Sequence, residues 1–272
     1  MPELPEVETI VRDLRKKICG LSIESIKIHD GRVVRQRTER EFSRRLLSQH
    51  IEKISRRGKA IIIALNNNKD SLIVQVMMTG QLIFSKDSAP QRDTKVTFRL
   101  SNGNSLHYND YRTFGRLQVV AGLDEIPYFK TIGPEPLEKD FTVPWLTKEL
   151  QKRKTPIKPL LLNHTFVAGI GNIYASEILF ASGIDPRRPA VSLKKKEIVL
   201  MHRFTIEILQ EAIRFRGTSM NTYRDTKGEK GKFMNRIKVY GREDENCLTC
   251  STVLVREFQA GRSTFYCPDC QK

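Results

Sequence analysis

The stretch IKPLLLNHTFVAGIGNIYASE, residues 157–177, decides how the second half of this chain folds. Two helix-like runs flank a centre in which Gly169 and Gly171 permit tight turns. Asn172 follows the second glycine and can cap a helix that continues through Glu177. The stretch therefore predicts a helix–tight turns–helix hairpin whose backbone amides can approach a phosphate. An ordinary helix–helix corner explains the local pattern equally well.

The sequence around this hairpin divides into a strand-rich first half and a helical second half. After the break GPEP at 133–136, helices are predicted at 144–153, 158–163, 172–182 and 193–216. A segment rich in Gly, Lys, Thr and Asn, 217–235, has little apolar content to pack and predicts a mobile loop. Before the break, helices are predicted at 5–18 and 38–48. Strands are predicted at 21–28, 59–65, 71–78, 81–85, 95–100, 105–109 and 115–120, with turns at Asn66-Asn67-Asn68 and Asn102-Gly103. Short strands at this spacing indicate an antiparallel sandwich or barrel.

Four of the five cysteines form two CxxC pairs near the carboxyl end. Cys247 and Cys250 are separated by sixteen residues from Cys267 and Cys270. This spacing is typical of a four-cysteine zinc site, in which each CxxC turn presents two thiolates to one ion. Two disulfides are the alternative, which a cytosolic protein disfavours. A closed shell of four thiolates leaves no open coordination position, so this zinc is expected to hold structure only.

The charge of the chain points to a polyanionic partner. Its 272 residues carry 47 Lys and Arg against 31 Asp and Glu, a net charge of +16. Nucleic acid is therefore considered first. The bases are spread along the chain, which disfavours a membrane-surface helix. No apolar run is long enough to span a bilayer and no secretory leader is recognisable, so a cytoplasmic location is expected.

The first ten residues, MPELPEVETI, contain three glutamates and no base. Pro5, Glu6 and Glu8 suit the first turn of a helix, because Pro fits the first position and acids favour the positive end of the helix dipole. Pro2 and Glu3 have no such explanation. Removal of the initiator Met would leave Pro2 as a free secondary amine, which can attack a sugar C1′ and form an iminium, with Glu3 moving protons beside it.

Three further groups could contact DNA. RRGK places Lys59 beside a glycine at a strand entrance. Arg112 and Phe114 share one face of an extended loop, and with Met78 they could fill the gap left by an extruded base. Arg262 lies between the two CxxC pairs, on a hairpin tip from which a cation could reach a phosphate. Taken singly, Lys59, Met78, Arg112 and Phe114 each fit a core residue or a solvated charge better than a DNA contact.

Together these motifs resemble the formamidopyrimidine-DNA glycosylase family, bacterial enzymes that excise oxidised purines. The similarity runs nearly end to end: PELPEVET (2–9), RRGK (56–59), MTG (78–80), DYRTFG (110–115), IGPEP (132–136), LLLNHTFVAGIGNIYASE (160–177), YGR (240–242) and AGRSTFYCPDC (260–270). The endonuclease VIII group is similar only more loosely.

The resemblance implies a multidomain α+β fold. Residues 1–132 would form a catalytic β-sandwich with flanking helices, 133–235 a helix–two turns–helix DNA-binding domain, and 236–272 a β-hairpin zinc finger. It also implies a DNA glycosylase and AP lyase that forms a Schiff base and nicks the strand by β,δ-elimination. The partner would be damaged double-stranded DNA, the protein a monomer, and the only cofactor one structural zinc ion, with no organic cofactor.

The resemblance also implies roles for individual residues. Pro2 would be the nucleophile and Glu3 the general acid/base. The supporting catalytic residues would be Lys59 and Arg262; the DNA-binding residues Met78, Arg112, Phe114, Lys158, Asn172 and Tyr240; and the base-pocket residues Glu6, Thr222 and Tyr223. The loop 217–235 would cover the extruded base.

At a few positions this chain departs from the common family pattern. Gln75 and Met77 stand where a His and an Arg are usual, and Asn163-His164 and Asn221 replace Asp-Gln and Arg. Because Gln75 and Met77 remove positive charge beside the lesion, a paralogue with altered lesion preference is an alternative. A lesion- or structure-specific DNA-binding protein with little turnover is a second, which the presence of Pro2, Glu3 and Lys59 disfavours. A zinc-ribbon RNA-binding protein is a third, for which no stacking platform is evident.

Overall fold

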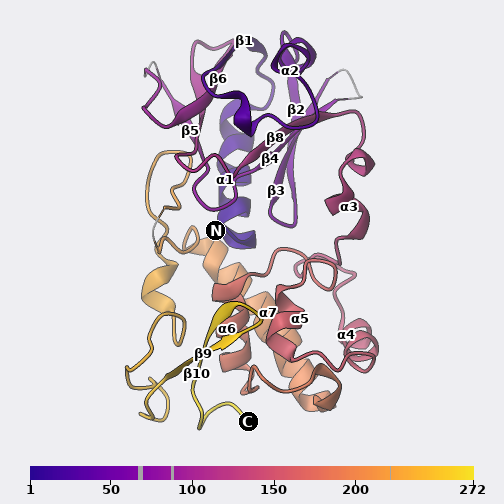
Figure 1. Ribbon diagram of the computed structural model, residues 1–272, viewed down its shortest axis with the longest axis vertical. Helices are drawn as coiled ribbons and strands as arrows, with labels where there is room; N and C mark the ends of the chain where they lie inside the picture. Colours follow the sequence, from indigo (N-terminus) through magenta and orange to yellow (C-terminus); the bar gives the residue numbers. More distant parts are fainter. Residues whose placement is uncertain (67–69, 87–88, 221) are drawn as a thin grey trace. The chain divides into compact units, whose positions relative to one another are not determined.

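The computed structural model describes residues 1–66, 70–86, 89–220 and 222–272. The chain forms two compact units, each of which combines two separate stretches of sequence. The first unit contains Met1–Lys130 and Phe215–Met234, and the second contains Thr131–Arg214 and Asn235–Lys272. Figure 1 gives the order of the elements along the chain. The predicted domain boundaries after residues 132 and 235 stay predictions.

Two four-stranded antiparallel sheets build the first unit, as the strand spacing predicted. One sheet has the order β1-β6-β7-β5 and the other β2-β3-β4-β8. The strands are β1 (Ile23–Ile28), β2 (Ile51–Arg57), β3 (Ala60–Leu65), β4 (Ser71–Gln75), β5 (Gln81–Ser85), β6 (Thr94–Leu100), β7 (Ser105–Asn109) and β8 (Arg116–Val120). Residues 67 and 68 of the predicted Asn66-Asn67-Asn68 turn lie outside the described residues.

Helix α1 (Leu4–Ile18) supplies one apolar face of the core between these sheets. Its residues Val7, Ile10, Val11, Leu14 and Ile18 are fully or almost fully buried, as their helical spacing predicted. Together with α2 (Glu39–Leu46), which Thr38 caps, this face packs against apolar side chains of both sheets. The helix therefore fixes the position of the amino terminus relative to the sandwich.

Strand β2 was not predicted, and its burial pattern explains why. Only Ile51 and Ile54 of its seven residues are buried, and it ends in two arginines, so its sequence shows no clear alternation.

A second, smaller apolar cluster lies on the other face of β3, where Ile62 and Ile73 pack near Phe129 of the short helix α3 (Pro127–Thr131).

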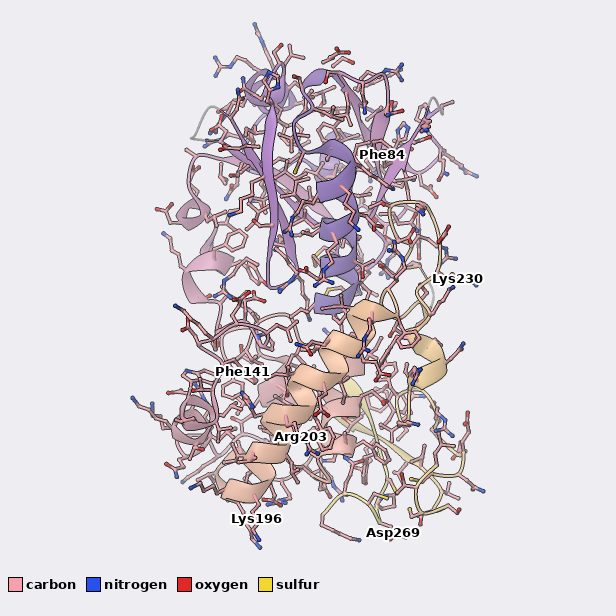
Figure 2. All side chains as sticks on the ribbon, turned by 180° about the vertical axis from the view of Figure 1, so that it is seen from behind. Phe84, Phe141, Lys196, Arg203, Lys230 and Asp269 are labelled. Atoms are coloured by element: carbon pink, nitrogen blue, oxygen red, sulfur yellow. The ribbon has the colours of Figure 1, made fainter. Side chains whose placement is uncertain are left out.

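The second unit begins with the helices that the sequence predicted. They are α4 (Val143–Leu150), α5 (Ile157–Leu162), α6 (Asn172–Ala181) and α7 (Lys195–Arg214). Thr142 caps α4 by accepting a hydrogen bond from the Trp145 N–H. Next to this helix, the Phe141 ring stacks on His202 of α7 with centroids 5.2 Å apart; Phe141 is labelled in Figure 2. The described residues of the two units also contain short 3-10 turns, at Gly31–Val33, Leu123–Glu125, Ala190–Ser192 and Phe233–Arg236.

A two-stranded hairpin completes the second unit. Strands β9 (Val255–Gln259) and β10 (Arg262–Tyr266) pair in antiparallel register, and Ala260 and Gly261 at the tip both have positive φ. This backbone matches the tight turns that join two strands. Within the described parts of the chain, no helix combines the length and apolar character needed to cross a membrane.

The prediction of a loop at 217–235 is confirmed, because the described part of this segment holds only a 3-10 turn and an isolated bridge. Its mobility stays a prediction, but the loop is more buried than its composition suggested. Thr218, Tyr223, Asp225 and Phe233 are all buried, and an isolated bridge pairs Thr218 with Lys232. The partners of its buried polar groups are both local and distant: Asp225 pairs with nearby Arg216, whereas the Thr218 N–H donates to Glu6, 212 residues away. The segment packs as part of the first unit.

Candidate active site

The amino terminus lies at the start of α1, with Pro2 and Glu3 both buried. The Glu3 N–H donates a hydrogen bond of 2.7 Å to Oε2 of Glu6, one turn into the helix. This bond satisfies one of the N–H groups that a helix start would otherwise leave without an acceptor. The proposed nucleophile and the proposed proton carrier are therefore held by the helix that anchors the core.

Glu6 also contacts the predicted base-pocket segment. Its Oε1 accepts a hydrogen bond of 2.7 Å from the Thr218 N–H, and its carboxylate is almost completely buried. The Tyr223 hydroxyl lies 3.5 Å from the Glu6 carbonyl oxygen. Burial, and then the charge of Glu6, raise the pKa of Tyr223, so this hydroxyl stays neutral. Thr222 donates through Oγ1 to the Met78 carbonyl at 2.7 Å. Asn221 lies outside the described residues.

Lys59 lies in the turn of the β2–β3 hairpin, directly after Gly58, which has a φ of 57°. The Lys59 N–H donates to the Tyr128 hydroxyl at 3.2 Å. Arg56, two residues before that turn, donates to the Gly58 carbonyl at 2.9 Å and forms an ion pair with Glu8 of α1 at 3.2 Å. Because Glu3 is the N-cap of the helix that carries Glu8, this ion pair ties the hairpin of Lys59 to the amino-terminal site. This pairing joins residues 48 positions apart, so no local pattern predicted it.

Met78, Arg112 and Phe114 form one exposed cluster, as predicted for a group that could enter a duplex. The Arg112 guanidinium lies over the Phe114 ring, 4.3 Å from its centroid, and its Nη1 is 3.7 Å from the Met78 sulfur. Met78 is 43% exposed and Phe114 47%, so their apolar surfaces are available to a partner. Exposed apolar groups of this size beside a cation suit contact with unstacked bases.

Buried Asp110 supports this cluster, and sequence reasoning missed it. One carboxylate oxygen accepts from the Thr79 hydroxyl, and the other accepts from the Gly115 N–H at 2.7 Å and the Tyr108 hydroxyl at 3.3 Å. A single side chain thus joins the loop after Met78 to the loop that carries Arg112. Burial, and then the charge of Asp110, raise the pKa of Tyr108.

We expect Arg112→Ala to weaken binding to a duplex with an abasic site by about 10-fold, since it removes a charged donor and a cation–π partner. Binding to undamaged duplex is expected to change much less, because that duplex has no gap to fill. Fluorescence anisotropy at fixed salt measures both affinities. Arg203→Ala is the matched control, because Arg203 on α7 (Figure 2) lies 4.4 Å from the centroid of the Phe204 ring. An equal loss on both duplexes would contradict the gap-filling role.

In the second unit, Asn172 and Lys158 converge on one carbonyl of the β9–β10 hairpin. Asn172 Nδ2 donates to the Ser263 carbonyl at 2.9 Å, and Lys158 Nζ donates to the same oxygen at 2.8 Å. Lys158 Nζ also donates to Thr264 Oγ1 at 2.9 Å, and the whole lysine is 1% exposed. The prediction that Asn172 caps α6 is wrong: Gly171 occupies the cap position, and the Asn172 side chain turns to the hairpin. Arg262, the residue before Ser263, is exposed at the tip.

Glu177 joins the helical hairpin to the zinc finger and was also missed. Its carboxylate accepts hydrogen bonds from the backbone N–H groups of Lys238 (2.8 Å), Val239 (3.0 Å) and Tyr240 (2.9 Å). Burial raises the pKa of Glu177, and the three N–H donors oppose that shift. The Tyr240 ring then packs against Phe265 of β10 with centroids 4.8 Å apart.

The four cysteines of the two CxxC pairs meet at one point. Their Sγ atoms all lie within 4.8 Å of one another, with Cys247 and Cys270 at 3.9 Å and Cys250 and Cys267 at 3.4 Å. A tetrahedral zinc ion with Zn–S distances of about 2.3 Å needs sulfurs about 3.8 Å apart. All four cysteines are free, which excludes the disulfide alternative in this structure. The donor set fits one structural zinc ion.

The departures from the family pattern lie at or near these groups. Gln75 ends β4 opposite Arg116, and Met77 follows with a φ of 50° just before Met78. Asn163 caps the end of α5 and accepts a hydrogen bond from the Thr165 N–H at 3.0 Å, while His164 is exposed. Gln75 and Met77 are thus within three residues of the exposed cluster in the sequence.

Three known domain families match most of the chain. Residues 1–117 match the formamidopyrimidine-DNA glycosylase N-terminal domain, and residues 132–224 match the H2TH domain of the same enzymes. Residues 244–272 match the zinc finger found in FPG and IleRS. The three matches follow the strand-rich, helical and cysteine-containing parts of the sequence.

Full-length relatives and solved structures agree with these matches. The formamidopyrimidine-DNA glycosylase of Pelotomaculum thermopropionicum is 42% identical, and the alignment covers 100% of this chain and 99% of that protein. The formamidopyrimidine-DNA glycosylase of Streptococcus mutans is 39% identical, and the alignment covers 100% of both chains. The Lactococcus lactis Fpg complex with abasic-site DNA is 37% identical with a TM-score of 0.92, covering 99% of both chains. A Lactococcus lactis Fpg complex with Fapy-dG DNA is 36% identical with a TM-score of 0.91, covering 99% of this chain and 100% of that one.

Proposed function

This chain belongs to the formamidopyrimidine-DNA glycosylase family, and we propose that it is a bifunctional DNA glycosylase and AP lyase that excises oxidised purines. The observation that carries this proposal is the buried Pro2–Glu3 pair at the start of α1, where Glu3 is bonded to Glu6 and Glu6 in turn contacts Tyr223 of the predicted base pocket. The relatives named above act in the same class, and solved relatives hold abasic-site and Fapy-dG DNA.

The chemistry begins at the nitrogen of Pro2 once Met1 has been removed. Its lone pair forms a bond to C1′ of the damaged nucleotide while the bond from C1′ to the base breaks and the base leaves with a proton. The amine then loses its proton, the C1′–O4′ bond breaks, and O4′ accepts a proton. The product is a cationic iminium joining Pro2 to C1′. Glu3 is adjacent to Pro2 in the chain and is our candidate for these proton transfers.

The iminium makes strand cleavage possible. It acidifies the C2′–H, so loss of that proton expels the 3′ phosphate, and a second elimination expels the 5′ phosphate. Water then hydrolyses the iminium and frees Pro2. Lys59, held near this site by its hairpin, is proposed to support the phosphates of the damaged nucleotide. Met78, Arg112 and Phe114 are proposed to fill the gap in the duplex.

Borohydride trapping combined with single-turnover base release tests this function. We expect wild-type protein to form a covalent adduct with abasic DNA and to release the base from duplexes containing Fapy or 8-oxoguanine. Pro2→Gly is expected to give much less adduct. Tight, salt-dependent binding to lesion DNA with neither adduct nor base release would instead indicate a DNA-binding protein without turnover.

Lesion preference is a separate point within this function. Because Gln75 and Met77 carry no positive charge beside Met78, we propose that selectivity for 8-oxoguanine over Fapy lesions differs from that of relatives with His and Arg at these positions. A panel of duplexes that contain either 8-oxoguanine or a Fapy lesion, with oxidised pyrimidines for comparison, measures this preference directly. We further propose that the enzyme acts as a monomer in the cytoplasm, where bacterial DNA is located.

Lys158 and Asn172 are proposed to act on DNA through the zinc-finger hairpin. The Lys158 ammonium is buried against Ser263 and Thr264, so we propose that it positions the neighbouring Arg262 for a phosphate instead of touching DNA itself. Tyr240, packed on Phe265 of the same hairpin, is proposed to contribute to this surface.

Lys158→Met is expected to lower DNA affinity by about 10-fold, because hydrogen bonds to a charged donor contribute about 1.5–3 kcal/mol. The slope of log affinity against log salt is expected to stay unchanged, since a buried lysine releases no counterion. Lys154→Met, which removes the same charge from an exposed position nearby, is the control. If Lys158→Met reduces the salt slope by about 1, the lysine contacts a phosphate directly and the positioning role is wrong.

A further inference from the structure

The Glu6 carboxylate holds two segments that are more than two hundred residues apart in the sequence. Oε2 accepts a hydrogen bond of 2.7 Å from the Glu3 N–H, and Oε1 accepts one of 2.7 Å from the Thr218 N–H. The side chain is 1% exposed, so water does not compete for these bonds. A carboxylate has acceptor capacity on both oxygens, which lets one side chain hold both N–H groups.

The turn that follows α7 is shaped around this carboxylate. Arg216 and Gly217 have φ values of 61° and 80°, both in the left-handed region. A Cβ on Gly217 would lie 2.6 Å from Oε1 of Glu6 and 2.8 Å from its Cγ. Glycine at 217 therefore provides the close approach that the Thr218 hydrogen bond needs, in addition to the backbone conformation.

A second set of bonds fixes the same turn to α1. Arg216 forms ion pairs with Asp13 of α1 and with Asp225, each at 2.5 Å. Thr226 Oγ1 also donates to Asp13 at 3.0 Å. These bonds place Thr218 against the helix that begins beside Pro2. The end of the segment that carries Thr222 and Tyr223 is thus held by the same helix as the nucleophile.

We propose that Glu6 is a positioning residue that couples the turn 216–219 to the amino-terminal nucleophile. When the turn is in place, Thr218 holds one oxygen of Glu6, and the other oxygen holds Glu3 and thereby Pro2. When the turn moves away, Glu6 loses its hydrogen bond to Thr218 and the Pro2–Glu3 segment is held less firmly. Attack on C1′ is thus favoured only when the turn 216–219 is seated against Glu6. This inference rests on the function proposed above.

Two simpler roles for Glu6 predict different results. A base-pocket contact predicts that removing the carboxylate affects substrates with a base and spares abasic DNA. A helix cap predicts lower thermal stability with unchanged rates at saturating DNA. Coupling predicts slower adduct formation on abasic DNA itself, at saturating DNA, because the nucleophile is misplaced even when there is no base to bind.

The test is borohydride trapping on abasic duplex under single-turnover, saturating conditions. Glu6→Gln keeps one acceptor but turns an NH₂ group toward a donor, so one of the two bonds is lost. We expect a rate about 10- to 100-fold below wild type, the range typical of a displaced reacting group. Gly217→Ala, which touches no proposed reacting atom, is expected to reproduce this loss by pushing on Glu6.

Gly103→Ala is the matched control, because Gly103 has a similar φ of 78° but no atom within 4 Å of its missing Cβ. It carries the same backbone strain and is expected to trap at the wild-type rate. In a Glu6→Ala background, Gly217→Ala is expected to add little, since its effect passes through Glu6. Thermal melts of each variant confirm that the folded protein is being assayed.

The outcomes are distinct. Wild-type trapping rates in both Glu6→Gln and Gly217→Ala would overturn the coupling and leave the proposed function intact. Losses that are fully additive in the double variant would also overturn it. No adduct from wild-type protein would overturn the proposed nucleophile, and the coupling with it.

Discussion

Glu3→Gln is expected to reduce base release from a Fapy-containing duplex by about 10²- to 10⁴-fold, the usual contribution of a positioned proton carrier. Glutamine occupies nearly the same volume and keeps the backbone N–H that donates to Glu6. It cannot donate or accept a proton in the reaction. Pro2 remains present, so the variant should still bind lesion DNA with nearly wild-type affinity. Rapid-quench measurement of base release at saturating enzyme gives the rate.

Glu24→Gln is the control, because Glu24 is an exposed residue of β1. It removes the same charge without touching the amino terminus. Mass spectrometry of each preparation should show the chain beginning at Pro2, since retained Met1 would block the amine. A Glu3→Gln variant that releases base at the wild-type rate would show that another group moves the proton. Retained Met1 in an active preparation would exclude Pro2 as the nucleophile.

Cys250→Ser is expected to lower affinity for lesion DNA by about 100-fold, because the finger loses its metal. A two-stranded hairpin is marginally stable alone, and structural zinc contributes about 10–16 kcal/mol of binding free energy in small fingers. Here Phe265 of β10 shares a small core with the ligands Cys247 and Cys267. Without the ion, Arg262 and its phosphate contact are no longer held in place.

Metal analysis is expected to find one zinc ion per wild-type chain and much less in Cys250→Ser. Cys19→Ser is the control, because Cys19 lies at the end of α1, outside the four-cysteine cluster. It should keep both zinc and DNA affinity. Normal DNA binding by metal-free protein would contradict the structural role of the zinc.

Much of the fold could be predicted because local signals agreed with tertiary packing. The spacing of Val7 to Ile18 specified the buried face of α1, and alternation specified most strands of the sandwich. The CxxC spacing specified the metal cluster, since both pairs are local turns. Strand β2 was missed because its two arginines and its charged outer face hide the period of two.

The candidate site was predicted less completely, since several of its bonds join distant segments. Arg112 and Phe114 were expected on one face of a loop, and their 4.3 Å contact confirms it. Asp110 and Glu177 gave no local signal, because their partners become neighbours only after folding. Asn172 was misassigned as a cap because its position after a glycine is typical of one, whereas its actual acceptor is 91 residues away.

Asp110 has a consequence for how this enzyme could change its specificity. One carboxylate accepts hydrogen bonds from both Thr79 and Gly115. The loop of Met78 and the loop of Arg112 are therefore held together as one unit. A Cβ on Gly115 would lie 1.5 Å from the Tyr108 hydroxyl oxygen, so there is little room for either loop to shift alone. Directed evolution toward a different opposite base should therefore yield paired substitutions in both loops. Single changes in one loop should be rare among the selected variants.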